Sequence, residues 1–367
     1  MKGASVHVQE VIRAMLNQGA SVNLLAANIG GERPPELSSV ALHPLPTLPK
    51  GDAEERERLA IESNGAISDL LRRNGPFDLV YERHSLWSYS AMEFAKEADV
   101  PGFLEVNAPL IAEQAQHRSL FDVGSANRVA ASAFGAATQV FAVSEPVADY
   151  VRSFAPGAKV TVQPNGVDPS RFPSSTAPSH PSPQFTVGFL GTLKPWHGLD
   201  VLIDAFGLLH KRRPKSRLLV VGDGPERGRS AQVIKDKGLL DDVVFVGACL
   251  PADVPGCLAS MDVAVASNLD CPGFYFSPLK VYEYMAAGLP VVVSAVGELR
   301  ELIVDGENGF LYPAGDAEAL AAILEKLYSE PETRTRVGAA GRRTVQEGHT
   351  WESIVRRILD SAQKTVT

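Results

Sequence analysis

Cysteines, long apolar runs and surplus positive charge are all scarce in this 367-residue sequence. Its three cysteines, Cys249, Cys257 and Cys271, show no C-x-x-C spacing, which argues against a disulfide framework or a zinc site and fits a reducing cytoplasm. No run approaches the roughly 18 apolar residues of a membrane span, and the first residues lack a basic-then-apolar pattern. With 43 acidic and 35 basic residues, the net charge of −8 disfavours broad nucleic-acid binding.

Alternating patterns of apolar strands and amphipathic helices run through most of the chain, which is long enough for two domains. Such alternation predicts an α/β fold with doubly wound parallel sheets. The proline- and serine-rich stretch 169–184 is the best linker candidate. We therefore predict an N-terminal Rossmann-like domain over 1–170 and a C-terminal one over 185–348. We expect the apolar stripe of the last helix, 349–367, to cross back to the N-terminal domain.

The start of the N-terminal domain is unusual. A doubly wound domain normally begins with a strand that leads into its first glycine turn. Here Met1-Lys-Gly-Ala-Ser5 leads directly into a helical stripe that includes Val8, Val11 and Met15. We expect that this first strand is missing with a short preceding segment; the alternative is an atypical domain. Its absence would expose the edges of neighbouring strands.

The stretch 276–294 predicts a helix that begins near Pro278 and stops at Gly288, followed by a buried strand. A helix N-terminus favours bound phosphate because its backbone N–H groups are unpaired and carry partial positive charge. Lys280 adds a cation in the first turn, and Glu283 can accept a hydrogen bond from a ribose hydroxyl. The pattern indicates a site for a diphosphate and a ribose. The alternative is an ordinary helix–strand connection with a chance lysine.

Two glycine-containing turns follow other predicted strands. Gly191-Thr-Leu-Lys-Pro-Trp-His-Gly198 places Lys194 and His197 at the carboxyl end of a strand, where open α/β sheets bind ligands. Gly222 and Gly224 allow close backbone approach after the next strand. A surface loop with a lysine and an ordinary turn are the alternatives. The basic run 210–217 lies at the opposite end and is interpreted as a solvated helix terminus, with weak contact to anionic lipid as the alternative.

Polar residues also end two predicted strands of the N-terminal domain. Glu105 and Asn107 lie two apart after 102–106 and so point the same way, where they can contact an acceptor or help remove its proton. Arg83 and His84 follow the predicted strand 77–81 and can reach the same place. In each case an ordinary structural role is the alternative.

These motifs together resemble the retaining, nucleotide-sugar-dependent glycosyltransferases of family 4, over nearly the whole chain. The most specific segment is Glu283-Tyr-Met-Ala-Ala-Gly-Leu-Pro-Val-Val292, and 301–309, 191–198, 165–168 and 144–145 add to it. The resemblance implies the GT-B fold, two Rossmann-like domains facing a central cleft. It implies a nucleoside diphosphate sugar as donor, a glycan, lipid-linked or small-molecule acceptor, and no cofactor or metal.

The strand-end and glycine-turn patterns and the resemblance together give the candidate site residues. Candidate catalytic residues are Lys194, His197, Asn107 and Glu105. Candidate donor-binding residues are Gly3, Gly191, Thr192, Lys194, His197, Gly222, Gly224, Ser277, Pro278, Leu279, Lys280 and Glu283. Candidate sugar contacts are Asp270, Tyr275 and His7.

Several positions depart from the family pattern. The family often has two glutamates eight positions apart, but Tyr275 precedes Glu283 at that spacing, so Asp270 is a candidate replacement. Thr192 and His197 stand where an arginine and a lysine are common, and Lys194 can compensate. Many members have a histidine where this chain has Asn107.

The sequence thus predicts a cytoplasmic hexosyltransferase, at most peripheral to the inner face of the membrane, that uses UDP- or GDP-sugar in polysaccharide or glycan synthesis. Two alternatives stay open: a nucleotide-sugar epimerase or phosphorylase on the same fold, and a catalytically silent nucleotide-sugar-binding protein. A nicotinamide dehydrogenase is disfavoured because no intact G-x-G-x-x-G follows a strand.

Overall fold

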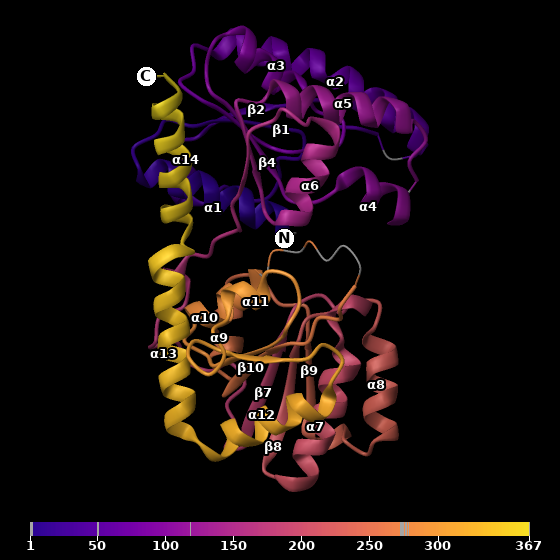
Figure 1. The fold of residues 1–367 in the computed structure, drawn as a ribbon, viewed down its shortest axis with the longest axis vertical. Coiled ribbons are helices and arrows are strands. Elements are labelled where there is room, and N and C mark those ends of the chain that lie inside the picture. Colours follow the sequence, from indigo (N-terminus) through magenta and orange to yellow (C-terminus); the bar gives the residue numbers. More distant parts are fainter. Residues whose placement is uncertain are drawn as a thin grey trace. The chain divides into compact units, whose positions relative to one another are not determined.

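The computed structural model describes residues 3–49, 51–117, 119–271, 275, 277 and 279–366. They form two compact α/β units (Figure 1). The C-terminal unit contains residues 166–271 and 279–350. The N-terminal unit contains residues 3–165, Tyr275, Ser277 and 351–366. Each has a parallel sheet covered by helices, as the two Rossmann-like domains of the prediction require.

The C-terminal unit is built on six parallel strands in the order β12-β11-β10-β7-β8-β9. These are β7 (Phe185–Leu190), β8 (Ser216–Val221), β9 (Val243–Gly247), β10 (Val263–Ala266), β11 (Val291–Ser294) and β12 (Phe310–Tyr312). Strands β7 and β10 are neighbours although two strands, β8 and β9, separate them along the chain. The strand order therefore reverses between them, and ligands of open α/β sheets bind outside the carboxyl ends of strands at such a reversal.

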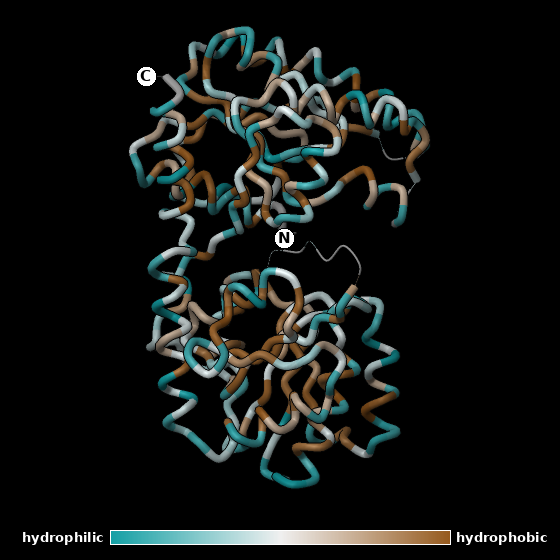
Figure 2. Tube along the Cα trace, viewed as in Figure 1, coloured by the Kyte–Doolittle hydropathy of each residue, from teal (hydrophilic) through white to brown (hydrophobic). Residues whose placement is uncertain are grey.

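Helices cover both faces of this sheet. They are α7 (Leu199–Arg212), α8 (Arg227–Asp236), α9 (Val254–Leu258), α10 (Leu279–Ala286), α11 (Leu299–Leu302), α12 (Ala317–Ser329) and α13 (Pro331–Gly348). Short 3-10 turns are η3 (Pro195–His197) and η4 (Leu240–Asp242). Alternate strand residues enter two different cores: Val187 and Phe189 pack with α7 and α12, whereas Leu190 packs with α9 and α10. Figure 2 shows the hydrophobic residues concentrated along these strands.

The N-terminal unit has a parallel sheet β3-β4-β5-β6 and a separate parallel pair β1-β2. The strands are β1 (Asn23–Ala26), β2 (Ala41–Pro44), β3 (Val80–Arg83), β4 (Gly102–Val106), β5 (Gln139–Ala142) and β6 (Val160–Val162). The helices are α1 (Gly3–Asn17), α2 (Ala53–Asn74), α3 (Ser90–Glu97), α4 (Leu110–His117), α5 (Val123–Ala136) and α6 (Glu145–Phe154), with η1 at Pro35–Leu37. Among the described residues no strand precedes α1.

The boundary between the units differs from the predicted linker. The chain leaves the N-terminal unit after Asn165, and η2 (Pro169–Arg171) already belongs to the C-terminal unit. Phe172 is 2% exposed in a core of that unit, and the Ser179 N–H donates to the Gly256 carbonyl at 2.9 Å. The proline-rich stretch is thus packed against the C-terminal unit because its few apolar residues have a core to enter.

The last helix, α14 (Trp351–Val366), packs against α1 of the N-terminal unit. Trp351, Ile354, Val355 and Ile358 form its buried face, in one cluster with Phe103 and Phe141 of the sheet. This face explains why a stripe so late in the sequence is apolar: it covers one side of the N-terminal sheet together with α1.

Replacing Ile358 by alanine should therefore destabilise the N-terminal unit. Truncating a fully buried isoleucine costs about 2–5 kcal/mol because of lost burial and a residual cavity. Arg356→Ala, on the exposed face of the same helix, is the control and should change the free energy of unfolding by less than about 0.5 kcal/mol. Urea unfolding followed by circular dichroism measures both. Equal midpoints for the two variants would contradict the docking of α14.

Candidate functional site

The glycine turns after β7 and β8 touch through their backbones. Gly191 and Gly222 have φ values of +147° and +137°, which L side chains rarely adopt. A Cβ on Gly222 would lie 1.9 Å from the Gly191 carbonyl oxygen, and one on Gly224 would lie 2.5 Å from the Leu193 oxygen. The Gly191 N–H donates to the Val221 carbonyl at 2.9 Å. The predicted glycines therefore set the close approach of two loops at the carboxyl end of the sheet.

Lys280 extends from the first turn of α10 into this place. Its Nζ lies 4.6 Å from the centroid of the Phe189 ring and would be 3.2 Å from a Cβ on Gly191. The Nζ is buried and finds no hydrogen-bond partner among the described residues. Burial lowers the pKa of Lys280 to about 7. An ammonium without partners beside a glycine turn is arranged to meet an anion that the protein itself does not supply.

His197, in the 191–198 loop, is close enough to Lys280 of α10 for the lysine charge to act on its ring. Burial, the charge of Lys280 and, to a smaller extent, that of Lys194 lower the pKa of His197 to about 4. The ring is neutral at pH 7, and its Nδ1 lies 2.5 Å from the Thr192 carbonyl oxygen, to which it can donate. The Lys194 Nζ lies 5.5 Å from the Trp196 ring centroid. Of the two lysines that the sequence singles out, Lys280 is the buried one.

Glu283, one turn after Lys280, pairs with Arg171. The Arg171 Nη1 to Glu283 Oε1 distance is 3.4 Å, and Arg171 also donates to the Pro251 carbonyl at 3.2 Å. Arg171 is not a sequence-predicted site residue, because a single arginine within Pro169-Ser-Arg171 carries no local signal of this contact. Tyr284 was missed as a support: its hydroxyl accepts from the Leu190 N–H at 2.7 Å, which attaches α10 to the end of β7.

Other predicted donor and sugar contacts lie elsewhere. Ser277 and Tyr275 belong to the N-terminal unit, where the Ser277 hydroxyl accepts from the Asn165 N–H at 3.3 Å and the Tyr275 hydroxyl donates to Glu113. Asp270 is exposed after β10, and Leu279 is 39% exposed at the start of α10. Pro278 lies outside the described residues.

A second polar group lies at the carboxyl end of β4 in the N-terminal unit. Glu105 Oε1 lies 2.7 Å from His7 Nε2 and accepts from Asn107 Nδ2 at 2.7 Å, and Glu105 Oε2 accepts from the Tyr81 hydroxyl at 2.6 Å. Burial alone would raise the pKa of Glu105, but the His7 charge and these hydrogen bonds outweigh it and lower the pKa to about 2. Gly3 begins the helix that carries His7.

Arg83 and His84 separate onto the two faces of this sheet because successive strand residues alternate. The Arg83 guanidinium lies near Tyr81. Burial raises the pKa of Tyr81, and the positive charge of Arg83 opposes this with a smaller effect. His84 packs on Phe134 at 5.0 Å between ring centroids on the other face, and burial lowers its pKa to about 4. His84 is thus a neutral core histidine, the alternative that the sequence analysis left open.

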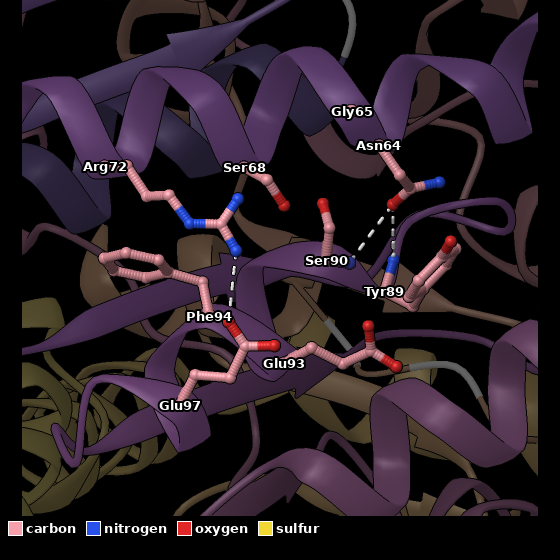
Figure 3. A pocket seen from close by; sticks show the side chains of 9 residues that line it. All are labelled: Asn64, Gly65, Ser68, Arg72, Tyr89, Ser90, Glu93, Phe94 and Glu97. Carbon is pink, nitrogen blue, oxygen red and sulfur yellow. Dashed lines mark hydrogen bonds and ion pairs between the residues drawn. The ribbon is translucent and has the colours of Figure 1, made fainter.

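A separate pocket of about 200 Å³ lies between α2 and α3 (Figure 3). Arg72 and Glu97 pair across it at 3.1 Å, and Asn64 Oδ1 accepts from the N–H groups of Tyr89 and Ser90. No residue predicted for the site lines it. The described residues bring no three metal-ligating side chains together. None of the helices in the described part of the chain is long and apolar enough to span a membrane.

Curated proteins similar to this chain are glycosyltransferases. The chain is 28% identical to a D-inositol 3-phosphate glycosyltransferase of Stackebrandtia nassauensis, over 92% of this chain and 81% of that protein. It is 34% identical to a phosphatidyl-myo-inositol mannosyltransferase of Mycobacterium leprae, over 55% of this chain and 53% of that protein. This second match, like that to a GDP-mannose-dependent mannosyltransferase of Mycolicibacterium smegmatis, spans little more than half the relative's length.

Solved structures show the same fold. Sucrose-phosphate synthase of Thermosynechococcus elongatus superposes with a TM-score of 0.73 at 20% identity, over 99% of this chain and 93% of that one. The Anabaena protein Alr3699/HepE in complex with UDP does so with a TM-score of 0.73 at 20% identity, over 99% and 96%. The GT-B fold that the sequence predicts is thereby confirmed.

Family models match both halves of the chain. The model for Glycosyltransferase Family 4 matches residues 1–171, and that for Glycosyl transferases group 1 matches residues 184–330. These matches and the relatives do not favour an epimerase, a phosphorylase or a silent binding protein. The chain belongs to the glycosyltransferases of family 4 and is a transferase that uses a nucleotide sugar.

Proposed function

We propose that this enzyme transfers a hexosyl group from a nucleoside diphosphate hexose to an acceptor hydroxyl with retention of anomeric configuration, and that Lys280 holds the diphosphate. The buried, unpartnered Nζ of Lys280 is the observation that carries the proposal. A buried cation without a counter-ion is strongly unfavourable. An anionic ligand bound beside Lys280, next to the strand-order reversal, would offset the unfavourable free energy of burying its ammonium.

The chemistry follows from where negative charge develops. As the bond to the anomeric carbon breaks, charge accumulates on the departing diphosphate, and preorganised donors lower the energy of that state. Lys280 would supply such a donor, whereas the N–H groups of Gly191, Leu193, Lys194, His197 and Gly198 already donate within the protein. The His197 ring, whose Nδ1 can donate to Thr192, would donate to the diphosphate only after gaining a proton at Nε2. Glu283, held by Arg171, would accept from ribose hydroxyls. We assign no step to a metal or cofactor.

The donor and acceptor classes come from the relatives. One relative is named a D-inositol 3-phosphate glycosyltransferase, a second a phosphatidyl-myo-inositol mannosyltransferase, and a third is named GDP-mannose-dependent. One solved neighbour was determined in complex with UDP. We therefore propose a GDP- or UDP-hexose as donor and a polyol or lipid-linked glycan as acceptor. The cytoplasmic location, with at most peripheral membrane contact, stays a prediction.

A ligand screen followed by product analysis tests the proposal. A ligand that binds the folded state raises the melting temperature by an amount that grows with the logarithm of its concentration over its Kd. We expect GDP or UDP to raise it selectively over ADP and NAD. Incubation with the matching sugar conjugate and an inositol or glycan acceptor should then give a glycoside whose anomeric proton coupling shows the donor's configuration. An inverted product would overturn retention, and no product with any donor would overturn the function.

Two variants test two contributions separately: Glu283→Ala tests the contact with the ribose, and Lys194→Ala tests the positive charge of the 191–198 loop. Losing a charged hydrogen bond costs about 1.5–3 kcal/mol, so Glu283→Ala should raise the donor KM about 10- to 100-fold. Lys194→Ala should lower kcat more modestly, because its ammonium already rests on Trp196. The control is Glu318→Ala, an exposed carboxylate at the start of α12. Unchanged kinetics in both site variants would contradict the site assignment.

A further inference from the structure

Glu105 and the three side chains around it come from α1, β3 and the end of β4 in the N-terminal unit. His7 belongs to α1, Tyr81 to β3, and Glu105 and Asn107 to β4 and the residues just after it. His7 is 5% exposed and Glu105 6% exposed. The titratable groups facing Glu105 are His7 and Tyr81, with Arg83 next along β3. From α14, Trp351 meets the His7 ring edge-on, with 4.7 Å between the ring centroids.

The ionised state of Glu105 fixes how Asn107 is oriented. A carboxylate has no proton to donate, so it can only accept hydrogen bonds. The group of Asn107 that lies 2.7 Å from Glu105 Oε1 must therefore be the amide nitrogen, as assigned. The carbonyl oxygen of Asn107 then faces away from Glu105. Asn107 follows the carboxyl end of β4 and is partly exposed, so this oxygen is offered where ligands of such sheets bind.

We propose that Glu105 is a positioning residue, which locks Asn107 so that its carbonyl oxygen accepts a hydrogen bond from a substrate sugar hydroxyl. This inference rests on the proposed function and deepens it. It also implies that neither Glu105 nor Asn107 abstracts the proton of the acceptor hydroxyl. An amide has no basic site at neutral pH, and a carboxylate that three neighbours hold in its ionised form is a weak base. His7 and Tyr81 complete the lock, and Trp351 holds His7 in place.

Exchanging the carboxylate and the amide between positions 105 and 107 tests whether Glu105 orients Asn107. Asn107→Asp keeps an oxygen toward the substrate but places a second carboxylate against Glu105, and two carboxylates this close cannot both ionise. We expect kcat/KM to fall about 100-fold at pH 8 and to recover as the pH is lowered and the pair shares a proton. Glu105→Gln combined with Asn107→Asp restores one donor and one carboxylate. The double variant should regain activity to within about tenfold of wild type.

Asn107→Ala is the second test, since it removes the acceptor oxygen without adding charge. It should lower kcat/KM about 10- to 100-fold, the effect of one lost hydrogen bond to a substrate. Separate KM values show whether the hydroxyl belongs to the donor sugar or to the acceptor. Every variant should still unfold cooperatively above the assay temperature, and binding of GDP or UDP should stay at wild-type values.

Two results would overturn the inference. One is Asn107→Ala with wild-type kcat and KM for both substrates. The other is a double variant whose loss equals the sum of the single losses in free energy, which indicates independent structural effects. Either is distinguishable from failure of the proposed function, in which the wild-type enzyme itself makes no glycoside.

Discussion

Lys280→Met is expected to weaken the binding of the nucleoside diphosphate and lower kcat/KM by about 10³-fold. The methionine keeps most of the aliphatic volume against Phe189 but removes the only buried ammonium that the described residues place beside Gly191. Removing one preorganised group that stabilises charge typically costs 10²–10³-fold in turnover, and weaker ground-state binding adds to it. Lys235→Met, on the exposed side of α8, is the control. Calorimetric titration with GDP and UDP and steady-state kinetics measure both effects.

Lys280 should also couple diphosphate binding to the uptake of a proton. In the free protein the pKa of Lys280 is about 7, so at pH 8 the group is mostly neutral. A bound diphosphate favours the charged form and raises this pKa. Binding at pH 8 should therefore take up a proton, and the Kd should rise up to about tenfold per pH unit above 7.

Titration at pH 8 in two buffers of different ionisation enthalpy measures the proton uptake. Wild type should take up close to one proton, and Lys280→Met should take up much less. His197→Gln should leave most of the uptake in place, because the pKa of His197 starts near 4 and the ring stays neutral at pH 8 unless the ligand shifts it far. Equal uptake by wild type and Lys280→Met would show that another group carries the linkage.

Local sequence signals predicted the elements of the C-terminal unit well. The helix predicted between Pro278 and Gly288 is confirmed as Leu279–Ala286, and Gly288 has a φ of +77° that ends it. Proline and glycine act through their own backbone preferences, so their effect is readable without tertiary contacts. Strands β7 and β8 are buried on both faces, so their sequences, Phe185-Thr-Val-Gly-Phe-Leu190 and Ser216-Arg-Leu-Leu-Val-Val221, are mostly apolar instead of alternating.

Elements and contacts that depend on distant partners were predicted less well. The strand expected at 77–81 is in fact Val80–Arg83, because pairing with β4 outweighs the polarity of Glu82 and Arg83. β2 (Ala41–Pro44) and β12 (Phe310–Tyr312) were not predicted, since each is short and lies at one end of its sheet.

The same limit applies to the candidate site. The sequence predicted one site for Lys280, His197 and Glu283 because each follows a predicted strand at the same sheet edge and because the motifs resemble those of the family. It could not show that the Lys280 side chain turns inward, that Arg171 meets Glu283, or that Tyr275 joins the N-terminal unit. These are side-chain directions and long-range contacts, which no local pattern encodes.

Gly222→Ala is expected to disrupt both the stability of the C-terminal unit and nucleotide binding. Two penalties combine at this position. A φ of +137° is accessible almost only to glycine, and the new Cβ would meet the Gly191 carbonyl oxygen at 1.9 Å. Because that oxygen belongs to backbone, relief requires the two loops to separate. We expect the free energy of unfolding to fall by about 3–5 kcal/mol.

Gly228→Ala is the matched control in the next helix. A Cβ at Gly228 meets nothing within 4 Å, and alanine favours a helix over glycine by about 1 kcal/mol, so this variant should be neutral or slightly more stable. Urea unfolding gives the stability difference, and titration with GDP or UDP at a temperature where both variants are folded gives the affinity. Gly191 also lies against Lys280, so separating the loops moves the backbone of the diphosphate site away from its cation. A folded Gly222→Ala protein that binds nucleotide like wild type would show that the loop contact supports the fold alone and that the diphosphate lies elsewhere.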